Sequence, residues 1–198
     1  SKIFLRLQNS EDVKPFSYSD KHTGNKMMKK VSTLLLISSA AFLFGCETTS
    51  SRPYTSSTNN VLKFQKVIAD SNTKIQLGNF TEGQGISKLT CRLNGPVDVS
   101  PGKTTAEYIR EAMQTELFLA QVYDVDGSIL INGQLESMKF SSLSPASWDL
   151  KFKVSSNKSE GYTVNTNYPF RTSYSAYSAC KNVADAFGPA VQKLISDV

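Results

Sequence analysis

The side chains best able to do covalent or metal chemistry in this sequence are three cysteines, Cys46, Cys91 and Cys180, and a single histidine, His22. A thiol can act as a nucleophile, bind a soft metal ion, carry a lipid or pair in a disulfide. General-base catalysis, serine triads and many metal sites rely instead on histidine. If the segment before Cys46 is removed as a signal peptide, no histidine remains for such chemistry.

Residues 27–45 have the order of a bacterial lipoprotein signal peptide. Two lysines, Lys29 and Lys30, precede an apolar run that is shorter than the roughly 20 residues of a transmembrane helix. The end of the run, Leu43-Phe44-Gly45-Cys46, resembles a lipobox, although Phe44 departs from the small or β-branched residue usual at that place. The resemblance implies cleavage before Cys46 and acylation of its sulfur and its new terminus. An ordinary cleaved signal or a buried core helix is the alternative.

The lipobox sets the expected location and the domain boundaries. Two or three acyl chains anchor a protein stably, and Glu47 in place of aspartate points, by the sorting pattern this resembles, to the periplasmic side of the outer membrane. Residues 1–26 are expected to be an upstream artefact or extension. Residues 46–60 are rich in Ser and Thr and predict a flexible tether, and residues 61–198 predict a single α+β domain.

The charge distribution argues against a nucleic-acid partner. The whole chain has 22 basic and 17 acidic residues, but residues 1–45 carry seven basic against three acidic ones. The rest of the chain is close to neutral, with fifteen against fourteen. A near-neutral mature chain gives no electrostatic reason for phosphate binding.

With Cys46 assigned to lipid, Cys91 and Cys180 remain in a compartment that is oxidising if the signal is real. We predict a disulfide between them, closing a loop of about 90 residues and stabilising the fold by roughly 4 kcal/mol in the chain-entropy model. Two separate buried thiols are the alternative.

The periodicity of residues 61–198 predicts an α+β fold with the order β-α-β-β-β-α. Val61–Ile68 is ambiguous between a short strand and a helical turn. A strand is expected over residues 74–80, and residues 81–102 are expected to be mostly loop. Thr104 and Glu107 form a capping box that opens a helix to about Val122, with Glu116 mainly on its wet side. Three further strands cover residues 128–140, with a bulge near Glu136-Ser137, then 148–154 and 162–170. A helix over residues 175–198 passes Pro189. We expect one antiparallel sheet of about four strands with two helices on one face.

Weaker motifs have simpler explanations. Ser155-x-x-Lys158 and Ser178-x-x-Lys181 match the acylation motif of penicillin-binding proteins, without its companion elements. Asp124-Val125-Asp126-Gly127 matches part of a calcium loop but suits a polar turn better. Tyr174 and Tyr177 are candidates for an exposed contact patch. No metal site and no cofactor are expected.

From Cys91 onward the chain resembles a family of uncharacterised proteobacterial lipoproteins. The matching residues are Cys91-Arg92, Tyr108 to Ala112 with Glu116-Leu117, Gly133-x-Leu135, Ser141-Ser142 before Trp148, Tyr168-x-Phe170 and Ala179-Cys180. More distantly the layout resembles YajG-like and LpoB-type lipoproteins, in which a tethered α+β domain binds another envelope protein. The resemblance implies a non-enzymatic binding or scaffold module held to the membrane, with an envelope protein as partner. A carrier of lipid or small ligands, and a hydrolase using one of the S-x-x-K serines, are the competing hypotheses.

Overall fold

The computed structural model describes residues 48–68, 73–84, 86 and 89–198. The expected upstream artefact or extension, the expected signal peptide and the expected lipidation site at Cys46 lie outside these residues. Among the helices that are described, none is both long and apolar enough to span a bilayer.

The main sheet has four strands in the order β2-β5-β6-β7. Their bounds are β2 (Ile75–Glu82), β5 (Ile129–Ser141), β6 (Ala146–Ser156) and β7 (Ser159–Phe170). The predicted antiparallel meander is confirmed for β5, β6 and β7. The expectation of a wholly antiparallel sheet is wrong, because β2 pairs with β5 in parallel. The chain between them includes a helix, α3 (Thr105–Leu119), and such a crossover returns the chain in the same direction.

A second, smaller sheet lies beside the first, in the order β1-β4-β3. It is built from β1 (Thr49–Ser50), β3 (Leu89–Thr90) and β4 (Pro96–Asp98). The strands β3 and β4 come from the stretch of residues 81–102 that was expected to be mostly loop. They are two and three residues long, which is too short for an alternating pattern to appear in the sequence.

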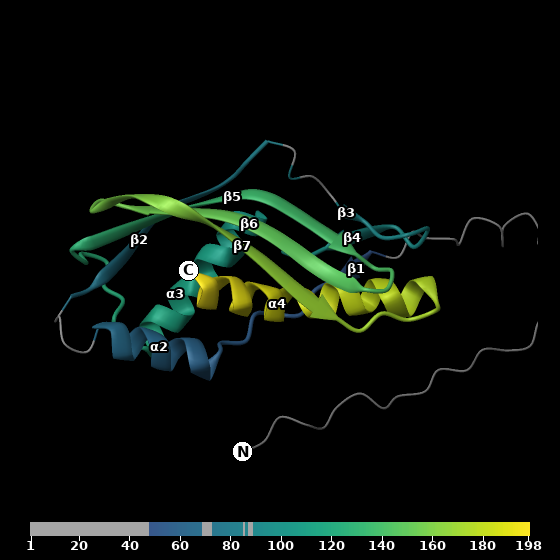
Figure 1. Cartoon of the computed structure of the whole chain (residues 1–198), viewed down its shortest axis with the longest axis horizontal. Coiled ribbons are helices and arrows are strands. Elements are labelled where there is room, and N and C mark those ends of the chain that lie inside the picture. Colours follow the sequence, from purple (N-terminus) through teal and green to yellow (C-terminus); the bar gives the residue numbers. More distant parts are fainter. Residues whose placement is uncertain (1–47, 69–72, 85, 87–88) are drawn as a thin grey trace, which may run out of the picture. The chain divides into compact units, whose positions relative to one another are not determined.

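Three helices lie on one face of the main sheet, where two were expected (Figure 1). The additional helix is α2 (Thr58–Ile68), which settles the ambiguity of its segment and packs against α3 and α4. The predicted capping box of α3 is confirmed, with Thr104 and Glu107 bonded to each other's backbone. The last helix, α4 (Ala176–Asp197), continues through Pro189.

The expected tether is largely docked on the domain. β1 pairs in parallel with β4, and the Ser51 amide donates to the Asp98 carbonyl at 2.9 Å. Arg52 makes two hydrogen bonds to the carboxylate of Asp185. Residues 58–60 already belong to α2. Composition alone predicted flexibility here, whereas the ordering comes from contacts with residues far away in the sequence.

The core lies between the main sheet and the helices. Trp148 and Phe152 of β6 and Ile109 of α3 are fully buried in this layer. Trp148 donates from its indole nitrogen to the Val183 carbonyl of α4 at 2.9 Å, so its polar group is satisfied inside the core. The bulge predicted in β5 is also confirmed, since the register with β6 shifts between Leu135 and Ser137.

Gly133 in β5 leaves the space that two aromatic rings occupy. A Cβ at this position would lie 2.4 Å from Phe152 and 2.9 Å from Phe80. We expect Gly133→Ala to lower the free energy of unfolding by about 1–3 kcal/mol through overpacking, measured by urea unfolding. Gly188→Ala is the control, because its Cβ would meet only the Tyr108 hydroxyl at 3.6 Å. Equal stabilities of the two variants would contradict this packing account.

Candidate functional site

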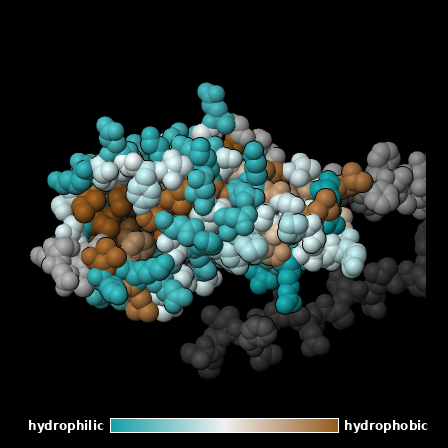
Figure 2. Space-filling view, viewed as in Figure 1, coloured by the Kyte–Doolittle hydropathy of each residue, from teal (hydrophilic) through white to brown (hydrophobic). Residues whose placement is uncertain are grey.

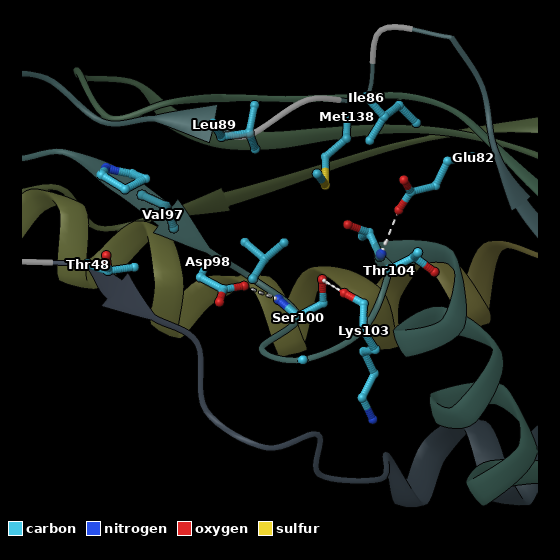
Figure 3. Close-up of a pocket in the computed structure, with 14 residues that line it drawn as sticks. Thr48, Glu82, Ile86, Leu89, Val97, Asp98, Ser100, Lys103, Thr104 and Met138 are labelled. Carbon is cyan, nitrogen blue, oxygen red and sulfur yellow. Dashed lines mark hydrogen bonds between the residues drawn. The ribbon is translucent and has the colours of Figure 1, made fainter.

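A cleft with a volume of about 590 Å³ opens beside the start of α3. Figure 3 shows its two walls. One wall is apolar, with Ile86, Leu89 and Met138 pointing into the space. The other wall is the turn from β4 into α3. There the Ser100 hydroxyl donates to the Lys103 carbonyl, and the Ser100 amide donates to the Asp98 carboxylate. A cleft with one apolar and one polar wall suits the side chain of a partner better than a fully enclosed small molecule.

Glu82 lies between the cleft and the helix. Its Oε1 accepts hydrogen bonds from the amides of Thr105 at 2.6 Å and Ala106 at 3.2 Å. These amides are in the first turn of α3, where a helix has free donors and a positive dipole end. The capping box serves the same turn, and its hydrogen bonds from Thr104 lower the pKa of Glu107. The helix start is therefore supplied with its own carboxylates and is not a free anion site.

Replacing Glu82 tests this role directly. We expect Glu82→Ala to lower the free energy of unfolding by about 1–2 kcal/mol, because two helix amides lose their acceptor. Glu82→Gln keeps an acceptor oxygen and should lose less. Thermal unfolding of both variants is the measurement, and a Glu82→Ala variant as stable as the parent protein would refute the capping role.

A buried carboxylate fastens the N-terminal segment to α3. Glu116 is fully buried, contrary to the expectation that it lies mainly on the wet side. Its Oε1 accepts from the hydroxyl of Tyr54 and from the Ser57 amide at 3.0 Å. Glu116 lies four and three residues after Ala112 and Met113, which are both buried. Residues at this spacing share one face of a helix, so the spacing indicates that Glu116 is buried, although its charge suggested an exposed position.

Tyr54 completes an aromatic contact between this segment and the helices. Its ring meets Tyr108 edge to face at 6.1 Å between centroids, and Tyr108 in turn contacts Phe187. Burial raises the pKa of Tyr54, and the Glu116 carboxylate raises it further, so the phenol keeps its proton and donates it. A smaller cleft of about 420 Å³ opens here between Arg52, Tyr108 and Glu111.

The predicted disulfide is present. Cys91 and Cys180 are bonded, their Cα atoms are 5.7 Å apart, and both residues are fully buried. The bond joins the start of the β3–β4 turn to the first part of α4. The disulfide cysteines therefore have a structural role, and neither has a thiol left for chemistry.

The other predicted positions are separate from the large cleft. Tyr174, just before α4, is fully exposed, and Tyr177, in the first turn of α4, is half exposed. Lys181 of the second S-x-x-K motif pairs with Asp185 at 2.7 Å. Asp124 accepts from the amide of Asp126, as expected for a polar turn. Within the described ranges, no three histidine, cysteine or acidic side chains group as a metal site.

Comparison with known proteins gives little further guidance. No family model matches the chain, and no curated protein matches it. A crystal structure of a Xanthomonas campestris protein from family model DUF330 covers 63% of this chain and 80% of its own, with 6% identity and a TM-score of 0.44. At that score, neither family membership nor function follows from the likeness.

Proposed function

We propose that this chain is a lipid-anchored outer-membrane lipoprotein that acts as a non-enzymatic binding or scaffold module in the cell envelope. The observation that carries the proposal is the buried Cys91–Cys180 disulfide. Structural disulfides persist in oxidising compartments and are rare in reducing ones, which fits a domain exported by the signal-like segment before Cys46. The acyl chains on Cys46 would hold the domain at the periplasmic face of the membrane.

The cleft beside α3 is the surface we propose for a partner protein. Its apolar wall can bury one or two side chains of a partner, and the backbone and hydroxyl groups of residues 100–104 can supply hydrogen bonds. The acidic side chains at the cleft are already used within the fold, Glu82 by α3 and Asp98 by Ser100. Because both carboxylates already accept hydrogen bonds within the fold, the cleft suits binding better than acid–base catalysis.

The carrier alternative requires an apolar cavity between the sheet and the helices. In the described residues, the large side chains Trp148, Phe152 and Phe187 fill that layer and are fully buried. No specific observation favours a carrier, and native mass spectrometry of the purified protein would reveal a bound lipid if there were one. No specific observation favours a hydrolase either, and Lys181 of the second S-x-x-K motif is engaged in an ion pair with Asp185 at 2.7 Å.

Two measurements test the proposal. A mass spectrum of the mature protein should begin at Cys46 and carry the mass of its acyl chains, and Cys46→Ser should move the protein from the membrane to the soluble fraction. A photo-crosslinking residue at Lys103, on the rim of the cleft, should capture a reproducible envelope protein, while the same residue at the exposed Lys158 should not. Unmodified Cys46, or no selective capture at Lys103, would refute the anchor or the binding role respectively.

A further inference from the structure

Three loops meet at one end of the domain and expose apolar side chains there. The exposed residues are Leu93 in the β3–β4 turn, Leu143 in the β5–β6 turn and Tyr174 before α4, with relative exposures of 104%, 67% and 107%. Tyr177, at the start of α4, is 50% exposed. We call these four residues the apolar tip. Figure 2 shows a small group of apolar atoms at this end of the domain, beyond the labels of β3 and β4 in Figure 1, and a larger apolar area at the opposite end.

Arg92 holds the three loops together. Its guanidinium donates to the Ser142 carbonyl at 2.7 Å and to the Tyr174 carbonyl at 3.3 Å. Arg92 has a φ of 50°, in the left-handed region that a residue with a Cβ seldom adopts. The next residue, Leu93, is fully exposed. The turn is therefore fixed in a conformation that directs an apolar side chain into the surroundings of the protein.

The chain enters the described domain at the same end. Thr49 of β1 accepts a hydrogen bond from Asn94, the neighbour of Leu93, at 3.3 Å. Cys46 precedes Thr48 by two residues, a span of about 7 Å at most. An acyl chain on Cys46 therefore has to enter a bilayer close to the apolar tip. Because β1 pairs with β4, residues 49–50 cannot act as flexible chain between Cys46 and the domain.

We infer that the apolar tip docks on the lipid surface of the membrane into which Cys46 is anchored. This inference rests on the proposed acylation of Cys46. Leucine and tyrosine suit the boundary between headgroups and acyl chains, where an apolar body is buried while a hydroxyl stays hydrated. The three loop segments, residues 91–95, 141–145 and 171–177, contain Arg92 and Arg171 and no acidic residue, so their charge is compatible with phosphate headgroups.

The opposite end of the sheet supplies the control. β5 spans 13 residues, about 40 Å, and Val125 lies beyond its start, in the turn where Asp124 bonds to Ile75. Val125 is 62% exposed, similar to Leu143. Docking through the apolar tip would leave Val125 far from the membrane.

Tryptophan quenching in vesicles distinguishes the two ends. The full acylated protein is reconstituted in vesicles of phosphatidylethanolamine with a minor fraction of phosphatidylglycerol, with or without bromine on the acyl chains. Tyr174→Trp and Leu93→Trp should show a blue shift and a loss of fluorescence that depends on bromine, whereas Val125→Trp should show neither. The native Trp148 is fully buried and gives the same background in every variant.

The outcomes separate the inference from the proposed function. If mass spectrometry finds acylated Cys46 but position 174 is not quenched, the docking inference is wrong and the anchor stands. Quenching at position 125 in place of 174 would also overturn it. If a crosslinker at position 174 captures a protein in cells while vesicles give no quenching, the tip is a protein interface and not a lipid-docking surface. If Cys46 carries no lipid, the proposed function itself fails.

Discussion

Replacing both Cys91 and Cys180 by alanine should lower the free energy of unfolding by about 4–5 kcal/mol. The cysteines are 89 residues apart in sequence, and the disulfide removes the entropy of that loop from the unfolded chain. A domain of this size is typically stable by about 5–15 kcal/mol, so the loss would leave a marginal fold. The loss should appear as a lower midpoint in urea unfolding followed by the emission of Trp148, the sole tryptophan.

Reductant provides the control for this prediction. Dithiothreitol should destabilise the parent protein by a comparable amount and should leave the double alanine variant unchanged. The same urea midpoint for oxidised and reduced parent protein would contradict the entropic role of the bond. The alanine variant avoids the buried hydroxyls that serine would introduce at two fully buried positions.

Removing the buried carboxylate should have the next largest effect. We expect Glu116→Ala to cost about 2–4 kcal/mol, because the Tyr54 hydroxyl and the Ser57 amide lose their acceptor in a buried place. Hydrogen exchange of residues 48–57 should rise more than that of the main sheet, since those two groups belong to the N-terminal segment. Glu111→Ala on the same helix is the control, since Glu111 pairs with Lys103 at the surface and should matter by less than about 1 kcal/mol.

A double-mutant cycle isolates the hydrogen bond to Tyr54. Tyr54→Phe removes only the hydroxyl and should cost about 1–2 kcal/mol. The double variant Tyr54→Phe with Glu116→Ala should cost less than the sum of the two single variants, by about 0.5 kcal/mol or more. Strict additivity would mean that the two groups are not energetically coupled, despite their contact.

A second, weaker contact holds the same segment. Burial alone would raise the pKa of Asp185, but hydrogen bonds from Lys181 and Arg52 outweigh it and lower the value. A carboxylate whose pKa is lowered by folding stabilises the fold at pH values above the usual pKa of aspartate. This contribution is lost as the pH falls through the pKa that the group has in the folded state. Because Arg52 is largely exposed, the contribution is small compared with that of Glu116.

Local patterns in the sequence predicted the local features of this fold. The capping box of α3, the strand at residues 148–154 and the bulge in β5 each depend on neighbouring residues, and all three are confirmed. The disulfide was predictable for a different reason, because the lipobox assignment left two cysteines for an oxidising compartment. The apolar tip was only partly predicted, through Tyr174 and Tyr177.

Apart from the disulfide, features that depend on distant contacts were not predictable from the sequence. The parallel pairing of β2 with β5 has no signature within either strand, since both parallel and antiparallel strands can alternate. The segment before α2 looks flexible by composition, yet Tyr54 and Arg52 bind residues of α3 and α4. Leu93 and Leu143 are isolated leucines in polar loops, and only the three-dimensional fold brings them together.

The pairing of β1 with β4 also limits how far this protein can act. If Cys46 is anchored in a bilayer as proposed, Thr48 follows it by only two residues, and β1 is paired from Thr49 onward, so the domain has almost no free chain with which to move outward. The distance from the bilayer that the domain can reach is then set by the length of the domain itself, about 40 Å along β5. A soluble or distant component of the envelope would have to come within that distance of the lipid to meet the cleft beside α3.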